Sequence, residues 1–298
     1  MSTETAGLAI ETVREVSPIR VDSIESASDP GSMYEDIILG DGEQTGVVKQ
    51  TGVVKLSILM AAYNEEETIE RAVKGLLQVS YPCEVEVIVV NDGSTDRTLD
   101  FLKDVDDPRF ILHSHETNRG KGASILTAAS LATGTHIVPF DADLEYAPEN
   151  LASMLDPVIK GRYDVVYGVR LFGCNTVYQS YLYAIGNKVL THFANILYNS
   201  YLNDLHNCLK LMPLHFFKNL GLTETGFGLD TQVTALLLRS GVRPFEVPVS
   251  YFSRSHEQGK KITWRDAVRC VWILMRTRVH LPTRKSSQRA IVSATSPR

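Results

Sequence analysis

The sequence predicts an α/β protein built on a mostly parallel sheet, and two observations indicate this fold class. Short apolar runs alternate with segments of helical periodicity from Leu56 to Val279, and strands that alternate with helices are typical of βαβ units. The composition is that of an ordinary globular protein, because 44% of the 298 residues are hydrophobic and 22% are charged. A chain of this length can bury a sizeable core.

The first half of this region predicts three strands and three helices. LSILM at 56–60 and EVEVIVV at 84–90 are apolar runs of strand length, and each ends in a polar turn. The segment at 65–78 places its apolar residues at helical spacing, which indicates an amphipathic helix. A third strand is expected at 109–113, and two further helices are expected from about Thr95 and at 121–132.

The second half continues the same alternation. Pro148 suits the start of a helix, and THIVPF before it reads as a strand in which Pro139 marks an end or a bulge. The expected strands are 135–140, 164–168, 207–212 and 243–249. The expected helices are one from Pro148, then 177–199, 228–240 and 262–279.

Charge is distributed unevenly along the chain. Residues 1–50 hold ten acids and three bases, whereas residues 253–298 hold eleven bases and two acids. We therefore expect four parts: a disordered acidic tail at 1–54, a catalytic domain at 55–252, a basic loop with an amphipathic helix at 253–281, and a disordered tail at 282–298. The net charge of −5 argues against a nucleic-acid partner.

The chain shows no feature of a secreted or membrane-spanning protein. It lacks an apolar run of roughly 18 residues or more, and its start lacks the basic and apolar regions of a secretory signal. Its four cysteines are far apart and form no CxxC pair, so neither a zinc site nor a disulfide framework is expected. These observations predict a cytoplasmic protein.

Polar residues follow the first two strands, where an open α/β sheet binds its ligands. In YNEE, an aromatic ring and a carboxylate at Tyr63 and Glu65 suit a base and a ribose. In NDGSTD, Asp92 can accept hydrogen bonds from a nucleobase or sugar. Each motif has a structural alternative, because Asn64 can cap the first helix and Ser94 or Thr95 can cap the second.

Two more motifs suit a diphosphate and a cation. In DADLE, the carboxylates of Asp141, Asp143 and Glu145 share one face if the backbone is extended, and hard oxygen ligands suit Mg²⁺ or Mn²⁺. In NRGKG, backbone amides near Gly120 and the Lys121 ammonium can approach phosphate. The alternatives are a solvated acidic loop for the first motif and a simple turn with a cap for the second.

The ordered set YNEE, NDGSTD, NRGKG and DADLE, each at an expected strand-to-helix turn, resembles the family 2 glycosyltransferases, which have the GT-A fold. The resemblance runs from about Leu56 to Val279 and is nearest to the branch that glycosylates dolichyl or polyprenyl phosphate. It implies a GT-A fold: a Rossmann-like, mostly parallel central sheet with helices on both faces, followed here by the C-terminal amphipathic helix.

The resemblance also implies roles by position. The residues expected to hold a UDP- or GDP-linked sugar are Ala61, Tyr63, Glu65, Asp92, Gly120, Lys121, Asp141, Ala142, Arg254 and Lys260. The expected ligands of Mg²⁺ or Mn²⁺ are Asp141, Asp143 and Glu145. The expected catalytic residues are Asp143, Arg170, which lies over the phosphates, and Asp230, a base if one is needed or otherwise a helix N-cap. Asp204 and His206 are the next candidates for a base.

The expected activity is a metal-dependent, inverting transfer of a hexose from a nucleotide sugar to polyprenyl or dolichyl phosphate. A hydroxyl acceptor on a glycan, glycolipid or secondary metabolite is the alternative enzyme hypothesis, and an inactive nucleotide-sugar-binding scaffold is the non-enzyme hypothesis.

The helix at 262–279 indicates a peripheral membrane contact on the cytoplasmic face, with a helix docked on the domain as the alternative. Its expected basic side is Arg265, Arg269, Trp272 and Arg276. Its expected apolar surface is Trp264, Ala267, Val268, Val271, Leu274 and Met275.

Overall fold

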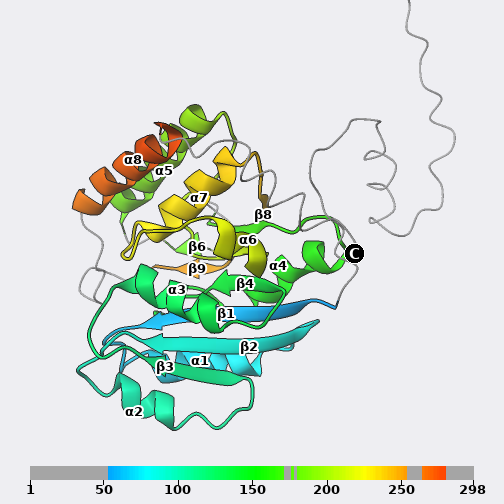
Figure 1. Cartoon of the computed structure of the whole chain (residues 1–298), viewed down its shortest axis with the longest axis vertical. Coiled ribbons are helices and arrows are strands. Elements are labelled where there is room, and N and C mark those ends of the chain that lie inside the picture. The colour runs from blue at the N-terminus through cyan, green and yellow to red at the C-terminus, as the bar shows by residue number, and fades with distance from the viewer. Residues whose placement is uncertain (1–52, 171–175, 178–179, 254–263, 280–298) are drawn as a thin grey trace, which may run out of the picture. The chain divides into compact units, whose positions relative to one another are not determined.

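The computed structural model in Figure 1 describes residues 53–170, 176–177, 180–253 and 264–279. Within them, seven strands form one sheet, in the order β3-β2-β1-β4-β7-β5-β8. These strands are β1 (Lys55–Ala62), β2 (Glu84–Asn91), β3 (Phe110–Ser114), β4 (His136–Pro139), β5 (Val166–Val169), β7 (Lys210–Pro213) and β8 (Phe245–Pro248). All seven match strands that the sequence predicts.

The sheet is mostly parallel, as predicted. The strand β7 is antiparallel to both of its neighbours, β4 and β5, and the other neighbouring pairs of the described sheet are parallel. A second, small parallel pair joins β6 (Thr176–Val177) to β9 (Tyr251–Phe252). The sequence does not predict this pair, because two residues are too few to show a period.

Helices cover both faces of the sheet, which confirms the predicted architecture (Figure 1). They are α1 (Ile69–Gln78), α2 (Thr98–Lys103), α3 (Lys121–Leu131), α4 (Asn150–Ile159), α5 (Tyr181–Tyr198), α6 (Leu214–Asn219), α7 (Leu229–Arg239) and α8 (Trp264–Val279). Of these, α6 is the one that the sequence analysis missed. None of the helices in the described residues is long and apolar enough to cross a membrane.

Two apolar cores follow from the alternation of side chains along the strands. On β1, Ile58 and Met60 belong to the core that α1, α2 and α4 cover, whereas Leu59 belongs to the core under α3, α5, α6, α7 and α8. These side chains are fully buried. The sheet is thus fixed from both faces, and its strand-end loops are held on a rigid base.

Pro139 ends β4, as the sequence predicts. The amide of Phe140 donates to the carbonyl of Leu59 on β1, at 2.8 Å. Successive residues of a strand point their amides to opposite neighbouring strands. The amide of Phe140 faces β1, so the nitrogen of Pro139 faces β7, and β7 pairs with β4 only at His136 and Ile137. The missing N–H of proline therefore costs no ladder hydrogen bond.

Several expectations concern residues outside the described part of the chain. These are most of the acidic tail at 1–54, the tail at 282–298, and the ligand-binding residues Arg254 and Lys260. They remain predictions.

Candidate functional site

The first two strand-end loops are joined to each other by hydrogen bonds. The side-chain oxygen of Asn64 accepts from the amide of Thr95 at 2.9 Å, and the amide of Asn64 donates to the hydroxyl of Ser94 at 3.1 Å. Asn64 has a φ of 52°, a left-handed conformation that asparagine tolerates. The cap alternatives for Asn64, Ser94 and Thr95 are wrong, because the N-cap residue of α1 is Thr68 and that of α2 is Arg97. The two motifs instead form one surface on which Tyr63 is 37% exposed.

Asp92 lies beneath this surface and holds the next loop. Its carboxylate accepts from the Nδ1 of His115 at 2.7 Å and from the amides of Arg119 and Gly120 at 3.0 and 2.8 Å. Burial alone would raise the pKa of Asp92, but these hydrogen bonds hold it below its ordinary value. Only 2% of the residue is exposed. The expectation that Asp92 binds a nucleobase or sugar directly is corrected: the structure uses it to position the 118–122 loop.

The start of α3 lies against the segment that precedes α7. Gly120 has a φ of 96°, and a side chain there would put its Cβ 2.5 Å from the carbonyl oxygen of Thr225. A Cβ at Gly122 would lie 2.6 Å from the carbonyl oxygen of Glu224. The amide of Ala123 donates to the carbonyl of Thr225 at 3.0 Å. Glycine is thus required at both positions, and this close approach brings Lys121 to the start of α7.

Four charged side chains meet at this point. The ammonium of Lys121 lies 2.6 Å from Asp141 Oδ1 and 3.8 Å from Asp230 Oδ2, and that of Lys210 lies 3.7 Å from Asp230 Oδ1. They come from α3, the turn after β4, α7 and β7, so distant parts of the sequence converge here. We call Lys121, Asp141, Lys210 and Asp230 the charged cluster.

Asp230 is an ion-pairing residue rather than a helix cap. The N-cap of α7 is Gly228, and no side chain caps that helix. Burial alone would raise the pKa of Asp230, but Lys210 and Lys121 hold it below its ordinary value. Burial lowers the pKa of Lys210, whereas the pKa of Lys121 is raised, because the attraction of Asp141 and Asp230 outweighs its burial.

The acids of DADLE do not form a three-carboxylate site. β4 ends at Pro139, and Leu144 takes a φ of 62°, so the backbone is turned rather than extended and the side chains do not share one face. Glu145 is only 8% exposed and accepts from the hydroxyl of Tyr251 at 2.7 Å. Among the described residues, no three His, Cys, Asp or Glu side chains group to hold a metal. This corrects the expected role of Glu145.

Asp141 and Asp143 nevertheless suit a divalent cation that a substrate shares. The Asp141 carboxylate is a quarter exposed at the turn after β4, and a lysine already lies beside it. Mg²⁺ and Mn²⁺ commonly take one or two protein carboxylates and complete their coordination with phosphate oxygens and water. The donor set therefore fits a cation that arrives with a diphosphate.

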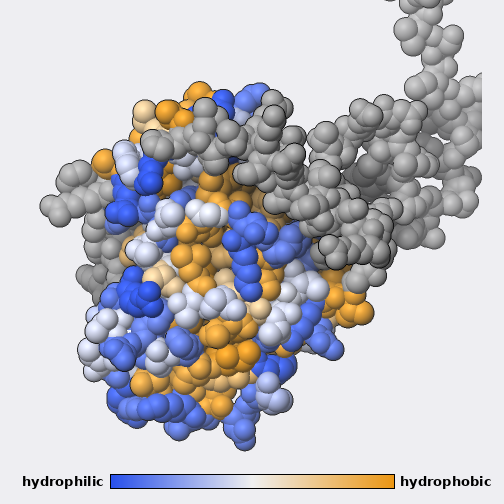
Figure 2. Space-filling model, in the orientation of Figure 1, coloured by the Kyte–Doolittle hydropathy of each residue, from blue (hydrophilic) through white to orange (hydrophobic). Residues whose placement is uncertain are grey.

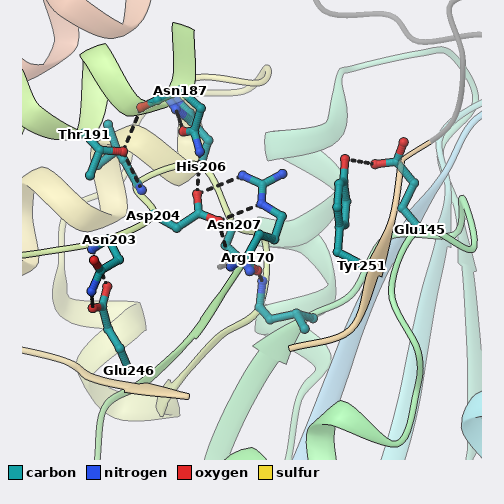
Figure 3. A network of polar contacts seen from close by, with 12 residues as sticks. Glu145, Arg170, Asn187, Thr191, Asn203, Asp204, His206, Asn207, Glu246 and Tyr251 are labelled. Carbon is teal, nitrogen blue, oxygen red and sulfur yellow. Dashed lines mark hydrogen bonds and ion pairs between the residues drawn. The ribbon is translucent and has the colours of Figure 1, made fainter. Parts of the chain in front are cut away.

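Arg170 belongs to a buried polar network (Figure 3). Its guanidinium donates to both carboxylate oxygens of Asp204, at 2.6 and 2.8 Å, and lies 4.9 Å from the ring centre of Tyr251. Asp204 also accepts from the side-chain amide of Asn187 at 2.8 Å. Arg170 is therefore held by an ion pair and connects to Glu145 through Tyr251. Its expected place over the phosphates remains a prediction.

The two remaining candidates for a base are unsuited to that role. Asp204 is 1% exposed and paired with Arg170, which together with Asn187 holds its pKa down although burial alone would raise it. Burial lowers the pKa of His206 to about 4. The Nδ1 of His206 donates to Asn187 at 3.0 Å, and its Nε2 lies 3.1 Å from the hydroxyl of Thr231. Both ring nitrogens are thus engaged inside the fold.

Sequence reasoning missed two residues that organise the site. Lys210 is 1% exposed on β7, and a lysine inside the otherwise apolar run LKLM is a signal that could have found it. His115, which donates to Asp92, stands in a polar loop and carries no such signal.

This mixed α/β sheet, with helices on both faces and acidic loops at its strand ends, is of the GT-A fold class. Two solved structures share the fold. Glucosyl-3-phosphoglycerate synthase from Mycobacterium tuberculosis, in complex with Mn²⁺, UDP and glucosyl-3-phosphoglycerate, is similar at 16% identity and a TM-score of 0.58, covering 77% of this chain and 81% of that one. TarS from S. aureus, in complex with UDP-GlcNAc, has 17% identity and a TM-score of 0.55, covering 80% of this chain and 71% of that one.

A family model described as glycosyl transferase family 2 matches residues 57–220, more than half of the chain, and the protein belongs to that family. The Haloferax volcanii protein "Glycosyltransferase AglJ" is 25% identical over 66% of this chain. The "Low-salt glycan biosynthesis hexosyltransferase Agl6" of the same organism is 24% identical over 83%. The alignments span 63% of AglJ and 59% of Agl6, so this chain matches less than two thirds of each relative.

Proposed function

We propose that this protein is a metal-dependent, inverting glycosyltransferase that moves a hexose from a UDP- or GDP-linked sugar to polyprenyl or dolichyl phosphate. The charged cluster is the observation that carries the proposal. It places two ammonium groups and two carboxylates at the carboxyl ends of the strands, where open α/β sheets bind ligands.

The donor side of the site is the surface formed by the first two loops, with Asp141 and Asp143 beside it. Tyr63 and Glu65 hold the base and ribose in this proposal. Asp141 and Asp143 hold Mg²⁺ or Mn²⁺, whose chemistry is to offset negative charge on the departing diphosphate. Lys121 supplies a further positive charge next to Asp141, so the leaving group departs into a cationic environment.

The acceptor side favours an acceptor that is already ionised. An efficient general base has a pKa near the working pH, but the pKa of Asp230 is held below its ordinary value by two lysines. An alcohol therefore gains little from Asp230 as a base. A phosphate monoester is largely ionised at neutral pH and needs cationic guidance instead, which Lys121 supplies.

The comparisons support the two halves of this proposal. The name of Agl6 supports a hexose as the transferred sugar. The synthase from M. tuberculosis was also solved with Mn²⁺, UDP and phosphoglyceric acid, so a protein of this fold accommodates a phosphate-bearing molecule together with a nucleotide and a metal.

The second candidate function is transfer to a hydroxyl acceptor. A carboxylate at Asp230, 18% exposed at the charged cluster, favours it, because a hydroxyl must lose its proton to a base. An inactive nucleotide-sugar-binding scaffold is the non-enzyme alternative. It would keep donor binding and show no transfer to any acceptor.

Asp230→Asn separates the two enzyme functions. Donor sugars are offered with Mn²⁺ and either polyprenyl phosphate or a panel of soluble alcohols, and products are identified by mass spectrometry. We expect the wild-type protein to glycosylate the lipid phosphate and the variant to retain most of that activity. Loss of all transfer in the variant, with nucleotide binding intact by calorimetry, would support the hydroxyl acceptor and contradict our proposal.

A further inference from the structure

The helix α8 is built into the fold by one of its sides. Cys270, Ile273, Leu274 and Thr277 are buried, and α8 packs on both α5 and α7. The carbonyl of Leu274 accepts from the hydroxyl of Tyr198 at 2.8 Å. The apolar surface expected from the sequence is therefore divided: Leu274 lies in the core, whereas Val268 and Met275 are exposed. The side chains of Trp264 and Arg265 lie outside the described part of the structure.

The opposite side of α8 carries a second apolar stripe. Val268, Trp272, Met275 and Val279 are 59, 52, 51 and 73% exposed, and their spacing places them within about 60° of one another on a helical wheel. Arg269 and Arg276 fall on one flank of this stripe and Arg278 on the other. All three arginines are exposed.

An open hollow lies beside this stripe. It is about 480 Å³ in volume and is lined by Glu224, Val268, Arg269, Trp272 and Arg276. The guanidinium of Arg276 lies 4.9 Å from the centre of the Trp272 ring. Tryptophan and arginine together are typical of residues at a membrane interface, where an apolar body lies beside a charged headgroup.

The neighbouring helix α5 also exposes apolar side chains. Leu182, Val189 and Ile196 are 81, 61 and 70% exposed and recur every seven residues, so they form one row along the helix. The two helices lie side by side in Figure 1, and Figure 2 shows hydrophobic and hydrophilic side chains intermingled in that part of the molecule.

We propose that the exposed faces of α8 and α5 form a surface that docks on an anionic phospholipid bilayer. Arg276 and Arg278 select this occupant by charge complementarity, because anionic headgroups attract basic residues at a membrane surface, whereas Arg269 is already paired with Glu224. A symmetric contact with a second copy of this chain would bring arginine-flanked stripes together, and like charges oppose that contact. An apolar stripe flanked by arginines on both sides suits shallow insertion among headgroups.

The helix α8 contacts the segment that carries Asp230. Arg269 donates to the carboxylate of Glu224 at 2.8 and 3.0 Å, and the hydroxyl of Thr231 lies 3.2 Å from the thiol sulfur of Cys270. The chain that leads from Glu224 to Thr231 carries Asp230. Where the acceptor is a lipid phosphate, which rests on the proposed function, docking brings this part of the site near the headgroup layer.

Vesicle cosedimentation of the full chain tests the proposal independently of catalysis. We expect binding to vesicles of phosphatidylcholine with phosphatidylglycerol and much weaker binding to phosphatidylcholine alone. The variants Arg276→Gln and Arg278→Gln should each weaken binding about fivefold. Trp272→Glu and Leu182→Glu should weaken it further, whereas Ile159→Glu, a matched control on α4 that is 43% exposed, should leave it unchanged.

Every variant keeps the same basic tail, so differences between variants report on the two helices. Unchanged thermal unfolding of each variant shows that it remains folded. The proposal is overturned if the helix variants bind anionic vesicles as well as the wild-type protein does, or if neither vesicle is bound. It is also overturned if light scattering shows a dimer that Trp272→Glu dissociates. Loss of vesicle binding leaves transfer to a solubilised acceptor measurable, so the two proposals fail separately.

Discussion

Replacing Lys210 by Met should reveal how strongly the charged cluster is held together. The lysine is 1% exposed, its ammonium donates to the carbonyl of Asn207 and lies 3.7 Å from Asp230, and its tip is 5.4 Å from the centre of the Tyr167 ring. Methionine fills a similar volume without the charge. Among the described residues, the variant leaves Asp230 with Lys121 as its nearest cation, at 3.8 Å.

The magnitude follows from burial. Removing one partner of a buried ion pair costs about 3–5 kcal/mol of unfolding free energy, because the other charge stays buried and uncompensated. Lys121 remains close and the Asp230 side chain is 18% exposed, so we expect the low end, about 3 kcal/mol. Lys160→Met is the matched control. Its ion pair with Asp156 is more than half exposed on both sides, and its loss should cost less than about 1 kcal/mol.

Urea denaturation of the single and double variants measures the coupling. Adding Asp230→Asn to Lys210→Met removes the uncompensated charge, so the double variant should be more stable than the sum of the single effects predicts, by about 1–3 kcal/mol. Additivity within about 0.5 kcal/mol would refute the pairing of these two residues. A Lys210→Met protein as stable as the wild type would refute the conclusion that Lys210 compensates the charge of Asp230.

Three further outcomes are expected. Asp92→Asn should lower the unfolding free energy, measured in urea, by about 1–3 kcal/mol, because one amide or imidazole donor loses its acceptor. The pKa of Asp92 is depressed in the folded protein, so its contribution to stability is present above the unfolded pKa near 4 and is lost as pH falls through the folded pKa. The stabilities of the wild type and the variant should therefore converge at low pH. His206, with a pKa of about 4, should give no inflection in the pH–rate profile between pH 6 and 8, roughly the range where an exposed histidine titrates, and a His206→Gln variant should keep the same profile shape. Chelation with EDTA should abolish transfer, Mn²⁺ or Mg²⁺ should restore it, and Asp143→Asn should require a higher metal concentration for half-maximal activity.

The sheet could be predicted from the sequence because each long strand is an apolar run and each loop between strand and helix is polar. LSILM and EVEVIVV carry that signal within themselves, and Pro139 marks the end of its strand by its missing amide. β6 and β9 could not be predicted, because each is two residues long and pairs only through tertiary contact.

The sequence predicts which loops form the site, but it does not predict the contacts between their side chains. Lys121, Asp141 and Asp230 were expected to serve one ligand site, and the structure brings them together. The partners of Asp92, Glu145 and Arg170 could not be predicted, because each lies in another part of the sequence: Asp92 binds His115, Glu145 binds Tyr251 and Arg170 binds Asp204. A carboxylate in a motif shows its charge, but burial and partners decide whether it faces a ligand.

Mass spectrometry of polyprenyl phosphate incubated with the protein, Mn²⁺ and a panel of UDP- and GDP-linked hexoses tests the proposed function most directly. We expect one donor to add a single hexose to the lipid phosphate and no product to form when metal is withheld, and NMR of the product should show the inverted anomeric configuration. Glycosylation of a soluble alcohol with none of the lipid phosphate, under the same conditions, would contradict it.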